Sequence, residues 1–240
     1  MNIDEAIDFK QSGFSEHFRS RGEVGKAEPL LDAMAGTVEE WEELVACYKC
    51  ALMEMTTRFE VLNEQFAIGC DQNPIETIKA RLKKPHSIYE KLKGMGAPLT
   101  VSSIEENIED VAGIRVICSF MNDIYLIADC LRSQDDLRIV LEKDYIKDPK
   151  PNGYRSLHII VEVPIFLRKG KKSVRVEIQL RTIAMDFWAS LEHKIRYKKD
   201  IPESVVSKLG MDLKSTAELA NLLDERMQEV RNDMRKSLDW

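Results

Sequence analysis

Four segments between about residues 110 and 182 are rich in β-branched residues and alternate apolar with polar side chains. They read VAGIRVICSF, LRIVLEKDYI, SLHIIVEVPIF and VRVEIQLRT. Alternation with a period of two is typical of strands that bury one face. The segment NDIYLIADCLRSQ, between the first two, has helical spacing instead. This stretch therefore predicts a small mixed sheet with helices packed on it.

Helical patterns flank the predicted strands on both sides. Helices are expected at about 37–66, over PIETIKARL, at about 87–95, at 183–198 and through most of the chain after 202. Pro85 must separate the second from the third, because proline removes a backbone donor and clashes with the preceding turn. The expected fold class is α/β (α+β), with helical arms at both ends.

The domain organisation follows from the same pattern. We expect a single domain over residues 39–238, with a core at 74–200 and helical arms at 39–66 and 203–238. Residues 1–38 have weak periodicity broken by glycines, which predicts a partly ordered N-terminal extension.

Composition and charge exclude several classes of protein. No apolar run approaches the roughly 20 residues that a membrane helix needs, and the N-terminus MNIDEAIDFK is too polar for a targeting peptide. The odd number of cysteines, five, mostly inside apolar segments, favours reduced thiols in the cytoplasm. A net charge of −6 argues against a general DNA or RNA binder. Basic clusters at 79–93 and 168–175 suit a compact anionic ligand, although solvated basic faces are as common.

The strand VRVEIQLRT carries an unusual polar face. Alternation places Arg175, Glu177, Gln179 and Arg181 on one side of it. Taken alone, this face is more typical of a solvent-facing side of a sheet than of a cleft wall. The neighbouring pattern EDVAGIRVICSF adds Asp110 at a strand entrance and Arg115 within the strand. If the two strands are adjacent, Asp110 and Glu177 could share a Mg²⁺ ion with substrate phosphates.

Phosphate-binding features surround the sequence RLKKPHSIYEK. The break at Pro85 leaves Arg81, Lys83 and Lys84 clustered at the predicted helix end. A new helix then begins, and its first amides are expected to face outward near Ser87. Lys91, one turn further, lies on the same helix side as Ser87.

Two later segments add candidates for binding a nucleotide base. The turn PKPNG presents Tyr154 and Arg155 just before a strand, and His158 alternates onto the polar face of that strand. An aromatic side chain there is either core or a platform for a base. Asp186 begins the helix that follows VRVEIQLRT, and its carboxylate could accept hydrogen bonds from guanine N1–H and N2–H₂. The alternatives are a structural histidine and helix surface charge.

Four motifs in this order resemble the synthetase domain of the RelA/SpoT family. They are EDVAGIR (109–115), NGYRSLH (152–158), VEIQLRT (176–182) and MDFWASLEH (185–193). The resemblance covers roughly residues 45–230 and implies a nucleotidyltransferase-like fold. The chain is similar in size to single-domain small alarmone synthetases. It has no His-Asp dipeptide and no room for a hydrolase domain, so the resemblance implies synthesis without hydrolysis.

The resemblance also implies a reaction and residue roles. Pyrophosphate passes from ATP to the ribose 3′-hydroxyl of GDP or GTP, with Mg²⁺ as cofactor, giving ppGpp or pppGpp and AMP. The residues implied for ATP are Arg81, Lys83 (or Lys84 beside it), Ser87, Lys91 and Arg115. Those implied for catalysis and the metal are Asp110 and Glu177. Those implied for the acceptor nucleotide are Tyr154, Arg155, His158, Gln179 and Asp186.

Partners and alternatives follow from the same resemblance. Some members are homotetramers, so a homo-oligomer is expected, whereas membranes and DNA are not expected partners. One alternative is a toxic relative that pyrophosphorylates the 3′ end of tRNA, which would make RNA a partner. The other is a catalytically inactive relative that only binds a nucleotide or RNA.

Overall fold

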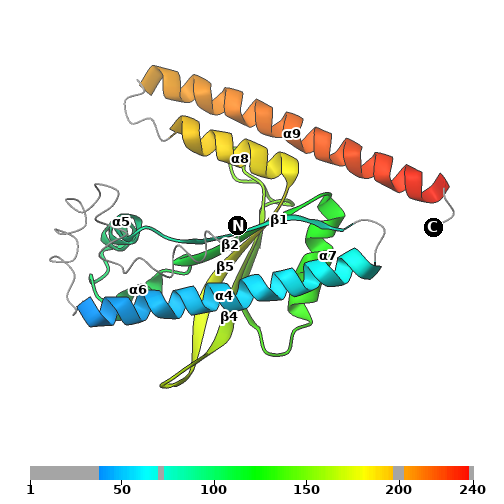
Figure 1. Ribbon diagram of the computed structural model, residues 1–240. Helices are drawn as coiled ribbons and strands as arrows, with labels where there is room; N and C mark the ends of the chain where they lie inside the picture. Colours follow the sequence, from blue (N-terminus) through cyan, green and yellow to red (C-terminus); the bar gives the residue numbers. More distant parts are fainter. Residues whose placement is uncertain (1–37, 70–72, 197–202, 238–240) are drawn as a thin grey trace, which may run out of the picture. The chain divides into compact units, whose positions relative to one another are not determined.

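The computed structural model describes residues 38–69, 73–196 and 203–237 (Figure 1). Its elements, in chain order, are α4 (Val38–Gly69), β1 (Ile75–Leu82), α5 (Pro85–Met95), α6 (Val101–Asn107), β2 (Ala112–Cys118), α7 (Met121–Arg132), β3 (Arg138–Asp144), β4 (Leu157–Leu167), β5 (Gly170–Thr182), α8 (Ile183–Arg196) and α9 (Glu203–Ser237). Within these ranges the strands form one sheet in the order β1-β2-β5-β4-β3. The small mixed sheet and its helices confirm the expected α/β (α+β) class.

The chain divides into two compact units. Unit 1 comprises Met1–Arg58, Lys79–Ile114 and Ile160–Glu177, and unit 2 comprises Phe59–Ile78, Arg115–Ile159 and Ile178–Trp240. The single domain over 39–238 stays a prediction. The predicted extension, residues 1–38, lies outside the described residues except for its last residue.

In unit 1, the apolar side of α4 supplies the largest share of the core. Trp41, Leu44, Tyr48 and Met55 are buried at helical spacing along this helix, which confirms the amphipathic pattern read from the sequence. In each of α5 and α6, the buried positions lie on one side, with Leu92 and Ile104 fully buried. The alternating residues Val174 and Val176 of β5 are buried as well, together with apolar residues of β2 and β4. None of the described helices is both long and apolar enough to span a bilayer.

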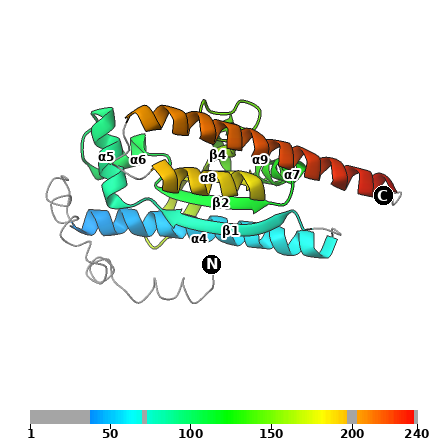
Figure 2. The ribbon, with the colours of Figure 1, turned by 90° about the horizontal axis from the view of Figure 1, so that it is seen from above.

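In unit 2, the two C-terminal helices α8 and α9 run side by side (Figures 1 and 2). Trp188 of α8 is buried and packs with Ala189 and with Ala217 of α9. Its indole Nε1 donates to Leu213 O at 3.0 Å and to Thr216 Oγ1 at 3.1 Å. A buried indole normally finds such a partner, so this contact specifies how the two helices pack.

The predicted helix over PIETIKARL is wrong, because these residues form strand β1. Ile75, Thr77 and Ile78 are β-branched, and the segment pairs with β2 in the sheet. Sheet pairing outweighs a weak local helix preference. Pro74 immediately precedes the first strand residue, a position where proline is tolerated. Arg81, Lys83 and Lys84 therefore lie at the end of a strand and not at the end of a helix.

The short helix α6 was not predicted from the sequence. Its N-cap is Thr100, whose side-chain oxygen accepts a hydrogen bond from Ser103 N at 3.1 Å. Threonine is among the preferred N-cap residues, so a capping signal was present. The predicted helices at 37–66, 87–95, 183–198 and after 202 are confirmed, with α5 beginning two residues earlier than expected.

Candidate functional site

In unit 1, the Asp110 carboxylate lies between two lysines. Lys83 Nζ donates to Asp110 Oδ2 at 2.6 Å, and Lys91 Nζ donates to Asp110 Oδ1 at 2.8 Å. Lys83 directly follows β1, and its backbone N donates to Val111 O at 2.8 Å, which ties it to the start of β2. Lys91 comes from the middle of α5. The lysine in the cluster is therefore Lys83, whereas Lys84 is exposed at the N-cap of α5.

The two lysines keep Asp110 ionised. Partial burial by itself would raise the pKa of this carboxyl, but the hydrogen bonds and charges of Lys83 and Lys91 outweigh burial and hold the pKa below its usual value. A half-buried carboxylate with two ammonium groups gives a compact polar cluster of fixed charge. Such a cluster can meet a triphosphate through its lysines and a divalent ion through its carboxylate.

The other predicted residues of unit 1 are placed around this cluster. Arg81 lies at the end of β1 beside Gly113 of β2, with its Nε 3.6 Å from the point where a Cβ on Gly113 would stand. The same point is 3.9 Å from the backbone oxygen of Glu177. Ser87 is exposed in the first turn of α5, but its amide donates to Lys84 O at 2.9 Å. The expected free amide at Ser87 itself is therefore wrong, because that amide is already paired within the chain.

The donor set fits a magnesium ion. Mg²⁺ is usually held by one or two carboxylates together with substrate phosphates and water. Asp110 lies just before β2, Glu177 lies within the adjacent strand β5, and both are hard oxygen donors of this kind, with Asp110 ionised. Among the described residues, no group of three or more His, Cys, Asp and Glu side chains gathers in one place.

In unit 2, the guanidinium of Arg181 joins three of the predicted acceptor residues. Its Nη2 donates to Tyr154 Oη at 2.6 Å and to Gln179 Oε1 at 3.0 Å, and its Nη1 donates to Asp186 Oδ1 at 3.1 Å. Arg181 follows Gln179 on the polar side of β5, and Asp186 lies in the first turn of α8. The strand-to-helix turn thus brings these side chains together.

Tyr154 also belongs to a group of rings. Its hydroxyl lies 2.7 Å from His158 Nε2. Tyr145 approaches both rings edge-on, with centroids 6.1 Å from Tyr154 and 5.2 Å from His158. Lys150 Nζ lies 4.6 Å from the ring centroid of Tyr145 and 4.9 Å from that of Tyr154. Both distances are within the range of a cation–π contact, so Lys150 adds a positive charge beside the two rings.

Arg115 contacts the acceptor residue Asp186. Its Nη1 lies 3.1 Å from Asp186 Oδ1, the same oxygen that Arg181 binds. The sequence assigned Arg115 to ATP, together with Arg81 of unit 1. Arg115 forms an ion pair with Asp186 of unit 2, and its role towards ATP stays a prediction.

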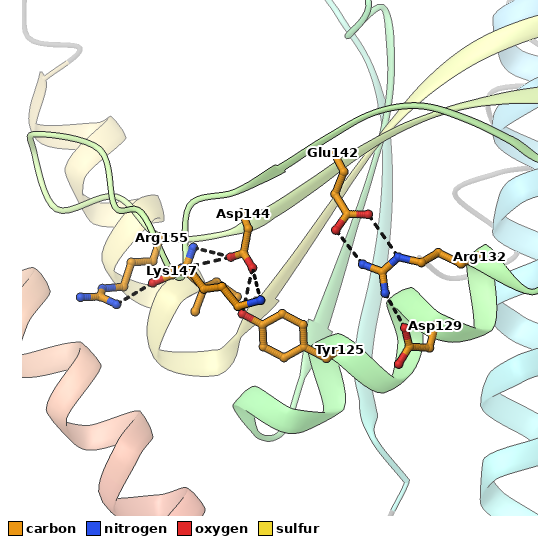
Figure 3. A network of polar contacts seen from close by, with 8 residues as sticks. Tyr125, Asp129, Arg132, Glu142, Asp144, Lys147 and Arg155 are labelled. Atoms are coloured by element: carbon orange, nitrogen blue, oxygen red, sulfur yellow. Dashed lines mark hydrogen bonds and ion pairs between the residues drawn. The ribbon is translucent and has the colours of Figure 1, made fainter.

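The loop that carries Tyr154 is held at its base by Asp144 (Figure 3). Asp144 Oδ1 accepts from the backbone N of Ile146 at 3.0 Å, while its Oδ2 accepts from Tyr125 Oη at 3.1 Å. Burial, followed by the charge of Asp144, raises the pKa of Tyr125 to about 12, so its hydroxyl stays a donor at neutral pH. Arg155 Nη1 donates to Ile146 O at 3.0 Å, which closes the network.

Helix α9 supports the same loop from another side. Gly153 has φ +89°, and a Cβ placed on it would stand 2.5 Å from Cβ of Ala217. Further along α9, Asp224 Oδ2 accepts from Thr182 Oγ1 at 2.6 Å, and Thr182 Oγ1 accepts from Met185 N at 3.1 Å. The helix therefore packs against the loop before Tyr154 and holds the start of α8.

The predicted site residues thus fall into two groups, one in each unit. Lys83, Lys91 and Asp110 are in direct contact in unit 1, and Tyr154, His158, Gln179 and Asp186 are linked in unit 2. The sequence reading did not assign roles to Arg181, Tyr145 or Lys150. Alternation had already placed Arg181 on the polar side of its strand, which was a usable signal.

Comparisons with known proteins show which family the chain resembles. The family model described as "Region found in RelA / SpoT proteins" matches residues 80–202. The chain is 44% identical over 206 residues to GTP pyrophosphokinase YwaC of Bacillus subtilis, covering 85% of this chain and 96% of that protein.

Solved structures give the same result. The structure resembles small alarmone synthetase 1 of Bacillus subtilis bound to its product pppGpp, with a TM-score of 0.74, 36% identity, and coverage of 81% of this chain and 98% of that one. The same synthetase bound to AMPCPP gives a TM-score of 0.68 and 32% identity, with coverage of 82% of this chain and 99% of that one. The motifs, the fold and these matches together place the chain in the RelA/SpoT family, among its small alarmone synthetases.

Proposed function

We propose that this chain synthesises ppGpp and pppGpp by transferring pyrophosphate from ATP to the ribose 3′-hydroxyl of GDP or GTP. The observation that carries the proposal is the likeness to a synthetase whose structure holds the product pppGpp. In the reaction, O3′ of the acceptor attacks the β-phosphorus of ATP. The bond from that phosphorus to the bridging oxygen of the α-phosphate breaks, and AMP leaves.

The residues of unit 1 are proposed to bind ATP. The related synthetase that holds AMPCPP, an ATP analogue, supports a binding site for ATP. Lys83 and Lys91 carry the positive charge that a triphosphate needs, and Ser87 and Arg81 lie on the adjoining helix and strand. Positioning and charge neutralisation are the main sources of rate in phosphoryl-type transfer.

Asp110 and Glu177 are proposed to hold Mg²⁺, and Glu177 to accept the 3′-hydroxyl proton. When bound, Mg²⁺ neutralises charge on the phosphates and polarises the phosphorus under attack. The lowered pKa of Asp110 supports its part, because only the ionised carboxylate binds the ion. Glu177 lies on the polar side of β5, two residues before Gln179.

The residues of unit 2 are proposed to bind the guanosine nucleotide. Tyr154 offers a ring for stacking, Gln179 and Asp186 offer polar groups, and His158 and Arg155 face the phosphates in this proposal. The linked contacts of Tyr154, Gln179 and Asp186 support a preformed base-binding site. A preformed site reduces the ordering cost of binding.

A product assay tests the proposed function. Purified protein is incubated with Mg²⁺, ATP and either GDP or GTP, and the nucleotides are separated by anion-exchange chromatography. We expect AMP in equal amount to ppGpp or pppGpp, and none without acceptor. No AMP with either acceptor would favour the alternative of an inactive nucleotide-binding relative.

The alternative acceptor, the 3′ end of tRNA, is not supported. The matched relative is named a GTP pyrophosphokinase, and the matched structure holds pppGpp. We therefore retain ATP and GDP or GTP as the ligands and propose no RNA partner. An incubation with tRNA in the product assay provides the direct control.

We further propose a homo-oligomer, with a homotetramer as the family resemblance implies. Helix α9 supports this, because Leu219, Leu222, Leu223, Met227 and Val230 are exposed at helical spacing. Light scattering coupled to size exclusion should give a multiple of the chain mass. Leu223→Glu should reduce that multiple, whereas Asn221→Glu on the same helix should not. A monomeric wild-type chain would contradict the proposal.

We also propose a single synthetase domain and a cytoplasmic location for this chain. Residues 39–238 are proposed to act as one synthetase domain without hydrolase activity. A cytoplasmic location is supported by the free thiols of Cys47, Cys50, Cys118 and Cys130, the cysteines of the described ranges. Free thiols persist in reducing compartments.

A further inference from the structure

We infer that Arg181 is a positioning residue that sets the recognition of guanine without itself being accessible to the nucleotide. Its side chain is 5% exposed, yet its guanidinium contacts Tyr154, Gln179 and Asp186. The inference rests on the proposed function, because it takes these three side chains as the acceptor site. It adds the residue that fixes their positions relative to one another.

The geometry of the guanidinium explains why an arginine is needed. Nη1 binds Asp186 on α8, while Nη2 binds Tyr154 in the loop and Gln179 on β5. The fork is planar and rigid, so each contact restricts the others. Its Cζ also lies 5.1 Å from the Tyr154 ring centroid, close enough for a cation–π contact. A lysine has one nitrogen and cannot hold three elements in the same way.

Burial makes these contacts strong and costly to lose. Hydrogen bonds from a charged donor are stronger than neutral ones, and a buried partner left without its donor is destabilised. Arg181 Nε is itself buried and has no hydrogen-bond partner among the described protein atoms.

The hydrogen-bond directions extend the effect of Arg181 to His158. An arginine can only donate, so Tyr154 Oη accepts from Arg181 Nη2. The single phenolic proton can then be donated to His158 Nε2, 2.7 Å away. This direction assigns the neutral His158 a proton on Nδ1 and a lone pair on Nε2. The chain Arg181–Tyr154–His158 therefore orients a base platform and a histidine together.

The two carboxylate oxygens of Asp186 have different partners in this inference: Oδ1 binds the two arginines and Oδ2 binds guanine. Arg115 and Arg181 both reach Oδ1, each at 3.1 Å. The inference gives Oδ2 to the guanine edge, where it would accept from N1–H and N2–H₂. Two guanidiniums on one oxygen hold the carboxylate in a single orientation. Loss of Arg181 should therefore weaken discrimination against a base that lacks the 2-amino group.

The first test compares Arg181→Lys with Arg175→Lys. Arg175 lies on the same side of β5 but pairs with Glu162, with Arg175 Nε 3.5 Å from Glu162 Oε1, and is the matched control. Wild-type turnover of ATP with GDP is established first, so that failure of the proposed function is recognised separately. For Arg181→Lys we expect the KM for GDP to rise about tenfold, equivalent to about 1.4 kcal/mol. The KM for ATP should stay within about twofold, and the preference for GDP over inosine diphosphate should fall. Arg175→Lys should match the wild type.

The second test does not depend on turnover, and its histidine measurement needs no arginine variant. Tyr154→Phe keeps the ring and removes the hydroxyl that Arg181 and His158 share. Its effect on GDP binding by calorimetry should be non-additive with Arg181→Lys. The ¹⁵N spectrum of the histidines should report Nδ1–H for His158 in the wild type, assigned with His158→Gln, and a changed signal in Tyr154→Phe.

Three results would overturn the inference. One is an unchanged KM for GDP and unchanged base preference in a folded Arg181→Lys protein. Another is a His158 signal that does not respond to Tyr154→Phe, which decides the matter if Arg181→Lys fails to fold. An equal loss of ATP and GDP affinity would also count against it, because that pattern indicates general destabilisation.

Discussion

The carboxylates of this chain differ in the cations that face them. Asp110 has two lysines and a lowered pKa, whereas Asp186 has two arginines on one oxygen. Lysine offers a compact charge that can turn to a phosphate, while arginine fixes geometry through its planar fork. At the residue scale, this difference supports a cluster of point charges for the phosphates of ATP and a planar frame for the acceptor base.

Glu177→Gln tests the proposed catalytic base at this scale. The amide keeps the shape of the side chain but cannot accept the 3′-hydroxyl proton, so turnover should fall by about 10²- to 10⁴-fold. Binding of ATP and GDP by calorimetry should remain measurable. Glu162→Gln is the control, since Glu162 lies on the polar side of neighbouring β4. Turnover at the wild-type rate in Glu177→Gln would remove this residue from the proposed role.

Among the elements, α9 makes more specific contacts than its exposed apolar residues suggest. It meets the loop at Gly153, the end of β5 at Thr182 and the start of α7 at Asp123. The contacts at Thr182 and Asp123 are hydrogen bonds, and the contact at Gly153 is a close steric approach. A shift of the helix by one turn would break all three. Helix α9 therefore acts as a support for the acceptor residues of unit 2.

The buried pair Asp123–Arg231 should dominate the docking of α9 on α7. Arg231 Nη1 lies 2.7 Å from Asp123 Oδ1, the side chains are 6% and 4% exposed, and the guanidinium lies over the Phe120 ring. Arg231→Met leaves the carboxylate buried without its partner and should lower the free energy of unfolding by about 3–5 kcal/mol.

Urea unfolding provides the measurement for this pair. The control is Arg226→Met on the same helix, whose exposed pair with Glu229 should contribute less than about 1 kcal/mol. Adding Asp123→Asn to Arg231→Met should recover part of the loss, because the unpaired charge is removed. Equal effects of Arg231→Met and Arg226→Met would contradict a buried docking pair.

Gly153→Ala tests the contact between the loop and α9. Alanine at φ +89° is strained, and its Cβ would stand 2.5 Å from that of Ala217, so we expect a loss of more than about 2 kcal/mol in unfolding free energy. Gly170→Ala is the control, since φ is +126° there but nothing lies within 4 Å of the added carbon. Unfolding in urea compares the two variants, and a similar loss in both would show that Ala217 yields easily.

At the scale of the whole molecule, most residues predicted for ATP lie in unit 1 and those predicted for the acceptor lie in unit 2, with Arg115 as an exception, since it is predicted for ATP but pairs with Asp186 in unit 2. Lys83, Lys91 and Asp110 belong to unit 1, whereas Tyr154 and Asp186 belong to unit 2. Each group has its own internal contacts, so each can be tested by binding one nucleotide alone. Stability, in contrast, is a property of the whole chain and responds to buried charges in either unit.

The raised pKa of Asp224 should make the stability of the fold depend on pH. Burial raises its pKa, and the hydrogen bond from Thr182 and the charge of Arg155 only partly oppose this. Because the folded pKa lies above the unfolded one, the folded state binds more protons between the two values. The contribution of Asp224 to stability is therefore most favourable below about pH 4 and declines as the pH rises through its folded pKa.

Asp224→Asn isolates this effect, because the amide does not ionise. The difference in unfolding free energy between wild type and variant should shift against the wild type as the pH rises from below about 4 through the folded pKa of Asp224, and should then become constant. Asp233→Asn, at an exposed position of the same helix, is the control for removing a charge. A difference that does not change with pH would contradict the raised pKa.

The sequence by itself determined the strands β2 to β5, the helices α4, α7, α8 and α9, and which side of β5 is polar. These features depend on periodicity along the chain, which folding does not alter. It also placed Asp110, Tyr154 and Asp186 at the ends of elements, where side chains from different segments meet.

Only the tertiary structure decided the features that depend on pairing in space. The segment of β1 has no dominant local preference and became a strand because β2 pairs with it. The contact of Arg115 with Asp186, and the position of Arg181 among three acceptor residues, join segments that no sequence spacing relates. The partners of a guanidinium depend on which groups lie within hydrogen-bond distance and on how deeply they are buried. Both conditions are met only after β5, the loop before β4 and α8 have packed together.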